Sequence, residues 1–128
     1  MHESAIAQNI LKIVETKLAA QSQHPSAGVL QAVHVAIGEF RNVDPQSLEF
    51  AFDSLKTGTD CRACRLQIEI QTALARCASS NHSYRPSLEN GFRCTECGAG
   101  IGYMERGEEL EIRGYTYTSQ AEEQSSYA

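Results

Sequence analysis

The sequence predicts an α+β fold, in which a small three-stranded sheet and two helices carry an inserted lobe that resembles a zinc ribbon. Three observations predict it. The chain opens with a helical hydrophobic period, three separated stretches alternate apolar and polar residues, and a compact group of cysteines and a histidine lies between the last two of those stretches. At 128 residues, the chain has the length of one domain with a small metal-bound lobe added.

Two helices are predicted before the cysteine group. In residues 3–21, apolar side chains recur at spacings of three and four, which is typical of one face of an amphipathic helix. These side chains are Ile6, Ile10, Ile13, Val14 and Leu18. The second helix begins with Asp44 as its N-cap and Pro45 as its first residue. Its apolar face is predicted to contain Leu48, Phe52 and Leu55, and Gly58 follows its end.

Three strands are predicted from alternation with period two. They cover residues 28–38, residues 65–71 and a stretch around residues 109–113 that Tyr115 and Tyr117 extend. In the second strand, Leu66, Ile68 and Ile70 are expected to face inward. The third strand has candidate partners only earlier in the chain, so the lobe is predicted to be an insertion. The expected limits are residues 1–73 and 107–118 for the α/β domain, 74–106 for the zinc lobe and 119–128 for a disordered tail.

The cysteine group has the spacing of a zinc site. Cys94 and Cys97 are separated by two residues and followed by Gly98, which permits the sharp turn that lets two thiolates hold one ion. Cys77 and His82 are separated by four residues and supply the other half of the site. The intervening residues are polar and typical of a loop, so a metal is expected to hold this segment together. Four protein ligands leave no open position for water, which predicts a structural site.

Other interpretations of the cysteines remain open. The group can consist of ordinary buried cysteines beside an exposed histidine, or Cys94 and Cys97 can form a disulfide, which the lack of an export signal disfavours. Cys61 and Cys64 offer a second pair, although two small residues entering a strand explain them more simply. A redox pair of the thioredoxin type is disfavoured because that motif opens a helix.

Composition narrows the functional class. The net charge of −5 and the pI of about 5.3 disfavour a nucleic-acid surface. No stretch has the length of a membrane span, and the first residues lack the features of a signal peptide. These features together predict a cytoplasmic protein in which cysteines bind metal.

The first three residues form a possible second metal site. A free amine at Met1, a deprotonated amide of His2 and the His2 imidazole can form fused chelate rings, a planar nitrogen set that suits Ni(II) better than zinc. Glu3 can add an oxygen donor or hold the imidazole. The alternative is that His2 is an exposed residue before a helix, where Glu3 favours the helix dipole.

The combination of motifs resembles the HypA/HybF family, the nickel metallochaperones of [NiFe]-hydrogenase maturation. The motifs are Met1-His2-Glu3, Ile37-Gly38-Glu39, Phe50-x-Phe52, Gly58-Thr59 and Cys94-x2-Cys97. The resemblance covers about residues 1–118 and implies a non-enzymatic chaperone with a nickel domain, an inserted zinc domain and nickel binding at the N-terminus. It also implies delivery to the hydrogenase large subunit together with a partner GTPase and, in some members, a role in urease maturation.

One departure from the family is clear. The family supplies two Cys-x2-Cys pairs, whereas this chain has Ser80 where the second cysteine after Cys77 would stand. We therefore predict that His82 replaces that cysteine. The rival function is a zinc-ribbon module that binds a protein or nucleic acid and has no nickel function. A zinc deaminase is excluded because its His-x-Glu and Pro-Cys-x-x-Cys motifs are missing.

Overall fold

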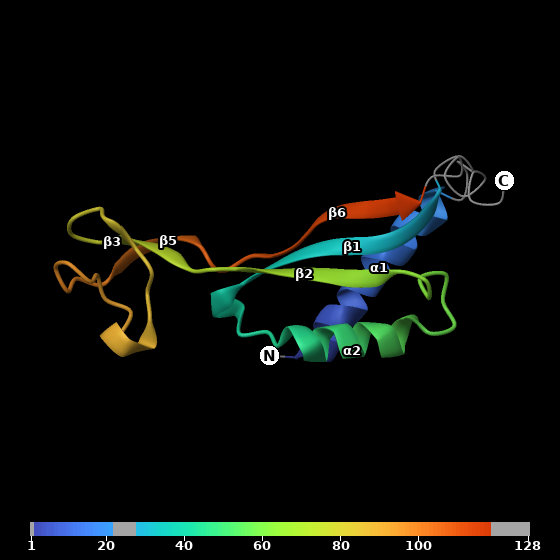
Figure 1. Cartoon of the computed structure of the whole chain (residues 1–128), viewed down its shortest axis with the longest axis horizontal. Coiled ribbons are helices and arrows are strands. Elements are labelled where there is room, and N and C mark those ends of the chain that lie inside the picture. The colour runs from blue at the N-terminus through green and yellow to red at the C-terminus, as the bar shows by residue number, and fades with distance from the viewer. Residues whose placement is uncertain (1, 22–27, 119–128) are drawn as a thin grey trace. The chain divides into compact units, whose positions relative to one another are not determined.

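The structure, a computed structural model, describes residues 2–21 and 28–118 (Figure 1). These residues form two compact units. One unit draws on the described residues of the ranges 2–35, 43–68 and 112–118, and the other on Ala36–Asn42 and Glu69–Glu111. The predicted disordered tail, residues 119–128, lies outside the described part of the chain. Within that part, no helix is both long enough and apolar enough to cross a membrane.

The two predicted helices are confirmed. Helix α1 spans Glu3–Gln21 and helix α2 spans Pro45–Lys56, and the two pack against each other. Asp44 is the N-cap of α2, and its side chain accepts a hydrogen bond from the backbone amide of Ser47. One predicted core residue differs, because Ile13 is 52% exposed. The buried face of α1 consists of Ala7, Ile10, Leu11 and Val14.

The first sheet has the order β2-β1-β6. Strand β1 spans Val29–Gly38, β2 spans Arg65–Gln71 and β6 spans Leu110–Thr118. Since β1 pairs with the strands that come before and after the cysteine segment, the prediction of an insertion between two strands of one sheet is confirmed. Strand β1 is buried along most of its length, as expected of a central strand. In β2 the predicted inward set is only partly buried, because Ile70 is 41% exposed on this edge strand.

The inserted segment contains a second sheet that the sequence analysis did not predict. Strand β3 (Leu74–Cys77) lies between β4 (Ser83–Tyr84) and β5 (Ile101–Arg106), and both pairings are antiparallel. The segment was expected to be a loop. Strands β4 and β3 have only two and four residues, and the six residues of β5, Ile-Gly-Tyr-Met-Glu-Arg, do not alternate apolar and polar side chains.

A small core lies within this second unit. It consists of Ala75, Cys77, Tyr84 and Cys94, against which Ala99 and Met104 pack. The Tyr84 hydroxyl donates a hydrogen bond to the backbone oxygen of Phe92 at 2.6 Å, which satisfies the buried end of that ring. The compact unit is wider than the predicted insertion of residues 74–106, since it also includes Ala36–Asn42. The domain limits given by the sequence stay a prediction.

The backbone approaches itself closely at Gly38 and Gly107 in the second unit. A Cβ atom at Gly38 would lie 2.1 Å from the carbonyl carbon and oxygen of Gly107. The amide of Phe40 donates to the Gly107 oxygen at 2.8 Å, so this crossing is also hydrogen-bonded. Only a residue without a side chain fits at position 38, which gives Gly38 a packing role.

We expect Gly38→Ala to lower the free energy of unfolding by more than about 3 kcal/mol, because the new methyl group meets backbone atoms that cannot rotate away. Urea unfolding followed by circular dichroism measures this loss. Gly100→Ala is the matched control, since a Cβ there meets no atom within 4 Å. Equal urea midpoints for the two variants would contradict the close approach.

Candidate metal centres

Three cysteine thiols meet in the second unit. Cys77 ends β3, and Cys94 and Cys97 lie in the turn that precedes β5. Their sulfur atoms all lie within 4.8 Å of one another, and the Cys77 and Cys97 sulfur atoms are 3.3 Å apart. Cys77 and Cys94 are buried, whereas Cys97 is exposed. The structure therefore brings together three of the four predicted zinc ligands.

The backbone around these thiols forms a tight metal-binding turn. The Gly98 amide donates to the Cys94 oxygen at 2.9 Å, and Gly98 has a φ of 75°, which the sequence analysis expected of this glycine. The Cys94 amide donates to the Ala99 oxygen at 2.8 Å and closes the turn onto the chain that leads into β5. This turn brings the thiols of Cys94 and Cys97 close enough together to bind one metal ion.

Cys77 is surrounded by donors that favour its thiolate. The Ser80 hydroxyl is the largest influence, and the amides of Ser79 and Ser80 each donate to the Cys77 sulfur at 3.4 Å. Together they lower the pKa of Cys77 to about 6, because hydrogen bonds to the charged form stabilise it. Three clustered sulfur donors, one of them readily ionised, form a donor set that fits zinc.

His82 is not part of this group. Its Nε2 atom lies 3.4 Å from a carboxylate oxygen of Glu96, and its side chain is 43% exposed. Its backbone oxygen accepts a hydrogen bond from the Cys77 amide at 2.8 Å, so the residue lies beside the site. The assignment of His82 as the fourth ligand stays a prediction.

Cys61 and Cys64 lie apart from the three-thiol group, in the first unit. Both are buried, and the Cys64 amide donates to the Cys61 oxygen at 2.9 Å in a turn that precedes β2. Burial and the nearby Cys64 raise the pKa of Cys61 to about 11, so its thiolate form is disfavoured at neutral pH. These properties support the interpretation of the pair as small core residues.

The predicted nickel ligands lie at the start of α1. Met1 is outside the described residues, whereas His2 is exposed directly before the helix. The His2 oxygen accepts hydrogen bonds from the amides of Ala5 at 3.1 Å and Ile6 at 3.2 Å. The carbonyl of His2 is therefore part of the helix start, which fixes the backbone beside the His2 imidazole.

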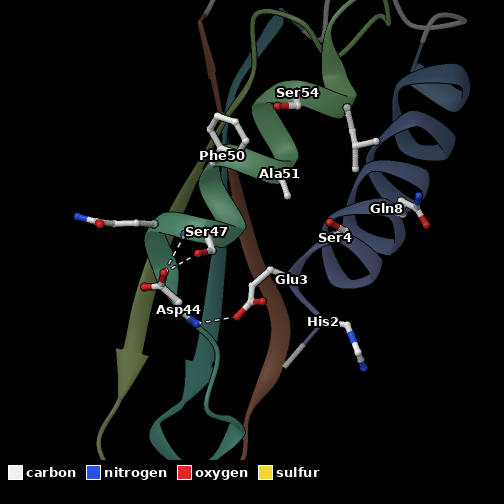
Figure 2. A pocket seen from close by; sticks show the side chains of 11 residues that line it. His2, Glu3, Ser4, Gln8, Asp44, Ser47, Phe50, Ala51 and Ser54 are labelled. Carbon is white, nitrogen blue, oxygen red and sulfur yellow. Dashed lines mark hydrogen bonds between the residues drawn. The ribbon is translucent and has the colours of Figure 1, made fainter.

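Glu3 connects α1 to the start of α2. Its Oε2 atom accepts a hydrogen bond from the Asp44 amide at 3.0 Å, and Figure 2 shows the Glu3 side chain directed toward Asp44 while His2 points elsewhere. This backbone hydrogen bond lowers the pKa of the Glu3 carboxyl, which is therefore ionised at neutral pH. The contact joins residues far apart in the sequence, and no sequence pattern indicates it.

A groove lies between the start of α1 and helix α2 in the first unit. His2, Glu3, Asp44 and Phe50 are among the residues that line it (Figure 2). Phe50 is 74% exposed although it is a large apolar residue. The sequence analysis identified Asp44 only as a helix cap and Phe50 only as part of a motif, so their place in this groove was missed.

A family model described as "Hydrogenase/urease nickel incorporation, metallochaperone, hypA" matches residues 1–117. The chain belongs to the HypA family. A hydrogenase maturation factor HypA from Chlorobium limicola is 32% identical over 116 residues, which cover 91% of this chain and 96% of that protein. A second protein of that name, from Synechococcus, is 27% identical over 88% of this chain and 83% of its own length.

Solved structures of HypA proteins share the fold. The solution structure of the Ni metallochaperone HypA from Helicobacter pylori covers 94% of this chain and all of its own, with 19% identity and a TM-score of 0.59. Another HypA solution structure covers 94% of this chain and 98% of its own, with 20% identity and a TM-score of 0.64. The family and the fold class inferred from the sequence are thus confirmed, and the thiol cluster is consistent with a zinc site.

We expect Cys94→Ala to reduce bound zinc from about one ion per chain to none, because two remaining thiols are too few to hold the metal in competition with a weak chelator. Metal analysis after dialysis measures this. Cys61→Ala is the control, since it removes a buried thiol outside the cluster. Zinc loss from both variants, or from neither, would contradict the assignment of the cluster.

Proposed function

We propose that this member of the HypA family binds Ni(II) at its N-terminus and delivers it for the maturation of [NiFe]-hydrogenase. The proposal is supported by the family match and, above all, by the exposed His2 held at the first turn of α1. In the same proposal, Cys77, Cys94 and Cys97 hold a resident structural zinc ion. Nickel is the cargo.

The helix start favours the proposed nickel chemistry. The Met1 amine, the His2 amide nitrogen and the His2 imidazole supply a planar set of nitrogen donors, which suits Ni(II). The His2 carbonyl is already engaged by the first turn of the helix, so little backbone freedom is lost when the metal binds.

Charge is the main obstacle at this position, and Glu3 offsets it. A helix N-terminus carries a partial positive charge, which disfavours a cation. A deprotonated His2 amide and the ionised Glu3 carboxylate bring negative charge to the same turn. The bond from the Asp44 amide holds Glu3 in place. Glu3 thus either supplies an oxygen ligand or stabilises the bound cation from close by.

The remaining parts of the proposal follow from this role. The protein acts in the cytoplasm without catalysing a reaction, and its partners are a nickel-handling GTPase and the hydrogenase large subunit. Urease maturation proteins are a second class of recipient, in keeping with the family description. Neither nucleic acid nor a membrane is among its partners, because the negative net charge disfavours the first and nothing in the sequence provides for the second.

We expect zinc-loaded protein with its native N-terminus to bind about one Ni(II) per chain and to lose that binding in His2→Ala. Adding two residues before Met1 should abolish it as well, because the amine then moves away from the chelate. Isothermal titration with Ni(II), with zinc measured in parallel, tests both variants.

The controls are His34→Gln, which changes a histidine bonded to Thr116 in the first sheet, and the same two residues added after Ala128. Nickel binding unchanged by the N-terminal variants would refute the proposed site. A zinc-loaded protein that binds no nickel would favour the rival function, a zinc-ribbon interaction module.

We expect Glu3→Gln to weaken Ni(II) binding about tenfold while the stoichiometry stays the same, because the negative charge beside the cation is lost and the nitrogen donors remain. The amide of glutamine still offers an oxygen to the Asp44 amide, which preserves the link between the helices. Glu15→Gln, farther along the same helix, is the control for charge alone. Equal affinities of the two variants would show that Glu3 has no role in holding nickel.

A further inference from the structure

The fourth corner of the thiol cluster is faced by Ser80. Ser80 lies in the turn between β3 and β4, and its amide donates to the Cys77 sulfur at 3.4 Å. The Ser80 side chain is also the largest influence that lowers the pKa of Cys77, and it favours the thiolate of Cys97 in the same way. The turn thus carries an oxygen donor beside the clustered thiols, which makes it a candidate for the fourth donor that a tetrahedral metal needs.

The local backbone explains why the hydroxyl reaches this corner. Cys77 and Ser80 are separated by two residues, the same spacing as Cys94 and Cys97. The amides of Ser79 and Ser80 both point at the Cys77 sulfur, and the Asn81 amide donates to the Cys77 oxygen at 3.2 Å. The turn therefore wraps around Cys77 and presents the side chain at its third following position to the other thiols.

His82 is held in a different arrangement. Asn81 has a φ of 59°, in the left-handed region, so the chain changes direction between Ser80 and His82. The His82 oxygen then accepts from the Cys77 amide as the hairpin closes, and its ring lies beside Glu96. To bind the metal, the imidazole would have to leave Glu96 and displace Ser80 from the thiols.

From these contacts we propose that the Ser80 hydroxyl, rather than the His82 imidazole, supplies the fourth ligand of the zinc site. The inference rests on the proposed zinc binding and deepens it by naming the donor set as three thiolates and one neutral oxygen. A neutral oxygen holds zinc less firmly than a fourth thiolate does. This corner is thus the position at which an incoming thiol or imidazole enters.

The experiment compares zinc X-ray absorption and Co(II) absorption spectra of the wild type, Ser80→Ala, Ser80→Cys and His82→Ala. For the wild type we expect three sulfur atoms at about 2.3 Å and one oxygen at about 2.0–2.2 Å, without the outer-shell signal of an imidazole. His82→Ala should leave the zinc and Co(II) spectra unchanged. Ser80→Ala should alter the Co(II) spectrum and weaken Co(II) binding roughly tenfold.

Ser80→Cys is the variant that gains a function. It should convert the site to four sulfur donors, strengthen the sulfur-to-Co(II) charge-transfer band and retain zinc at chelator concentrations that strip the wild type. Because this variant adds a metal ligand and removes none, we expect it to fold, so its spectra can be interpreted even if Ser80→Ala fails to fold.

Three results would overturn the inference. An imidazole signal in the wild type that disappears in His82→Ala would assign the corner to His82. A Co(II) spectrum unchanged by Ser80→Ala would show that the hydroxyl is not a ligand. A wild-type protein that binds no zinc would reject the proposed zinc site itself, which distinguishes that failure from a wrong fourth ligand.

Discussion

The pairing of β1 with two strands at once is the constraint on which the rest of the structure depends. Strand β1 lies between β2, which leads into the second sheet, and β6, which follows it. Because an inner strand uses the hydrogen bonds of both its edges, the two ends of the insertion are both held by β1. The close approach of Gly38 to Gly107 lies at the end of β1, where a side chain at residue 38 would break the crossing. Residue 38 therefore has to be a residue without a side chain.

The second unit lacks the apolar core that would make it stable without help. The cluster around its thiols contains four buried residues, of which two are the metal-binding candidates Cys77 and Cys94. A cluster of this size buries too little apolar surface to offset the chain entropy lost on folding. In the proposed zinc site, binding of the metal by thiolates would supply the missing free energy, because the site forms only when the unit is folded. Cys77 and Cys94 are thus part of the core and, in the proposed site, would also be ligands, which would stabilise so polar a segment.

Much of the first unit was readable from the sequence because its signals are local. The helical period gave the bounds of α1, and Asp44 with Pro45 gave the start of α2. The sequence predicts burial wrongly for side chains whose exposure depends on which other elements pack against them. Ile13 belongs to the apolar period of α1 and Ile70 to that of β2, yet both are exposed because no element covers them in the described structure. The second sheet was missed since two of its strands have only two and four residues and the six-residue β5 does not alternate apolar and polar side chains.

In the candidate sites, too, local features could be predicted from the sequence and tertiary contacts could not. The spacing of the cysteines predicted the three-thiol cluster, because a sharp turn makes neighbours in sequence into neighbours in space. The bond between Glu3 and the Asp44 amide joins two helices, and the bond from the Ser80 amide to the Cys77 sulfur depends on how one turn closes. Neither can be inferred from residue types alone. Sequence identified the elements of each site, and tertiary contacts determined their arrangement.

The chemistry of the two proposed sites explains how one small protein can keep a resident ion and release a cargo ion. Thiolates in a tetrahedral arrangement favour zinc, whereas a planar set of nitrogen donors favours Ni(II). Affinity alone would not separate the two metals, because zinc and nickel each bind well to both sets of donors. The coordination geometry of each site is what separates them. His2 of the proposed N-terminal site is exposed at a helix end whose partial charge opposes a cation, so we expect this site to lose nickel more readily than a buried site would. Weak retention at one end of the chain and firm retention in the thiol cluster are what delivery of nickel requires.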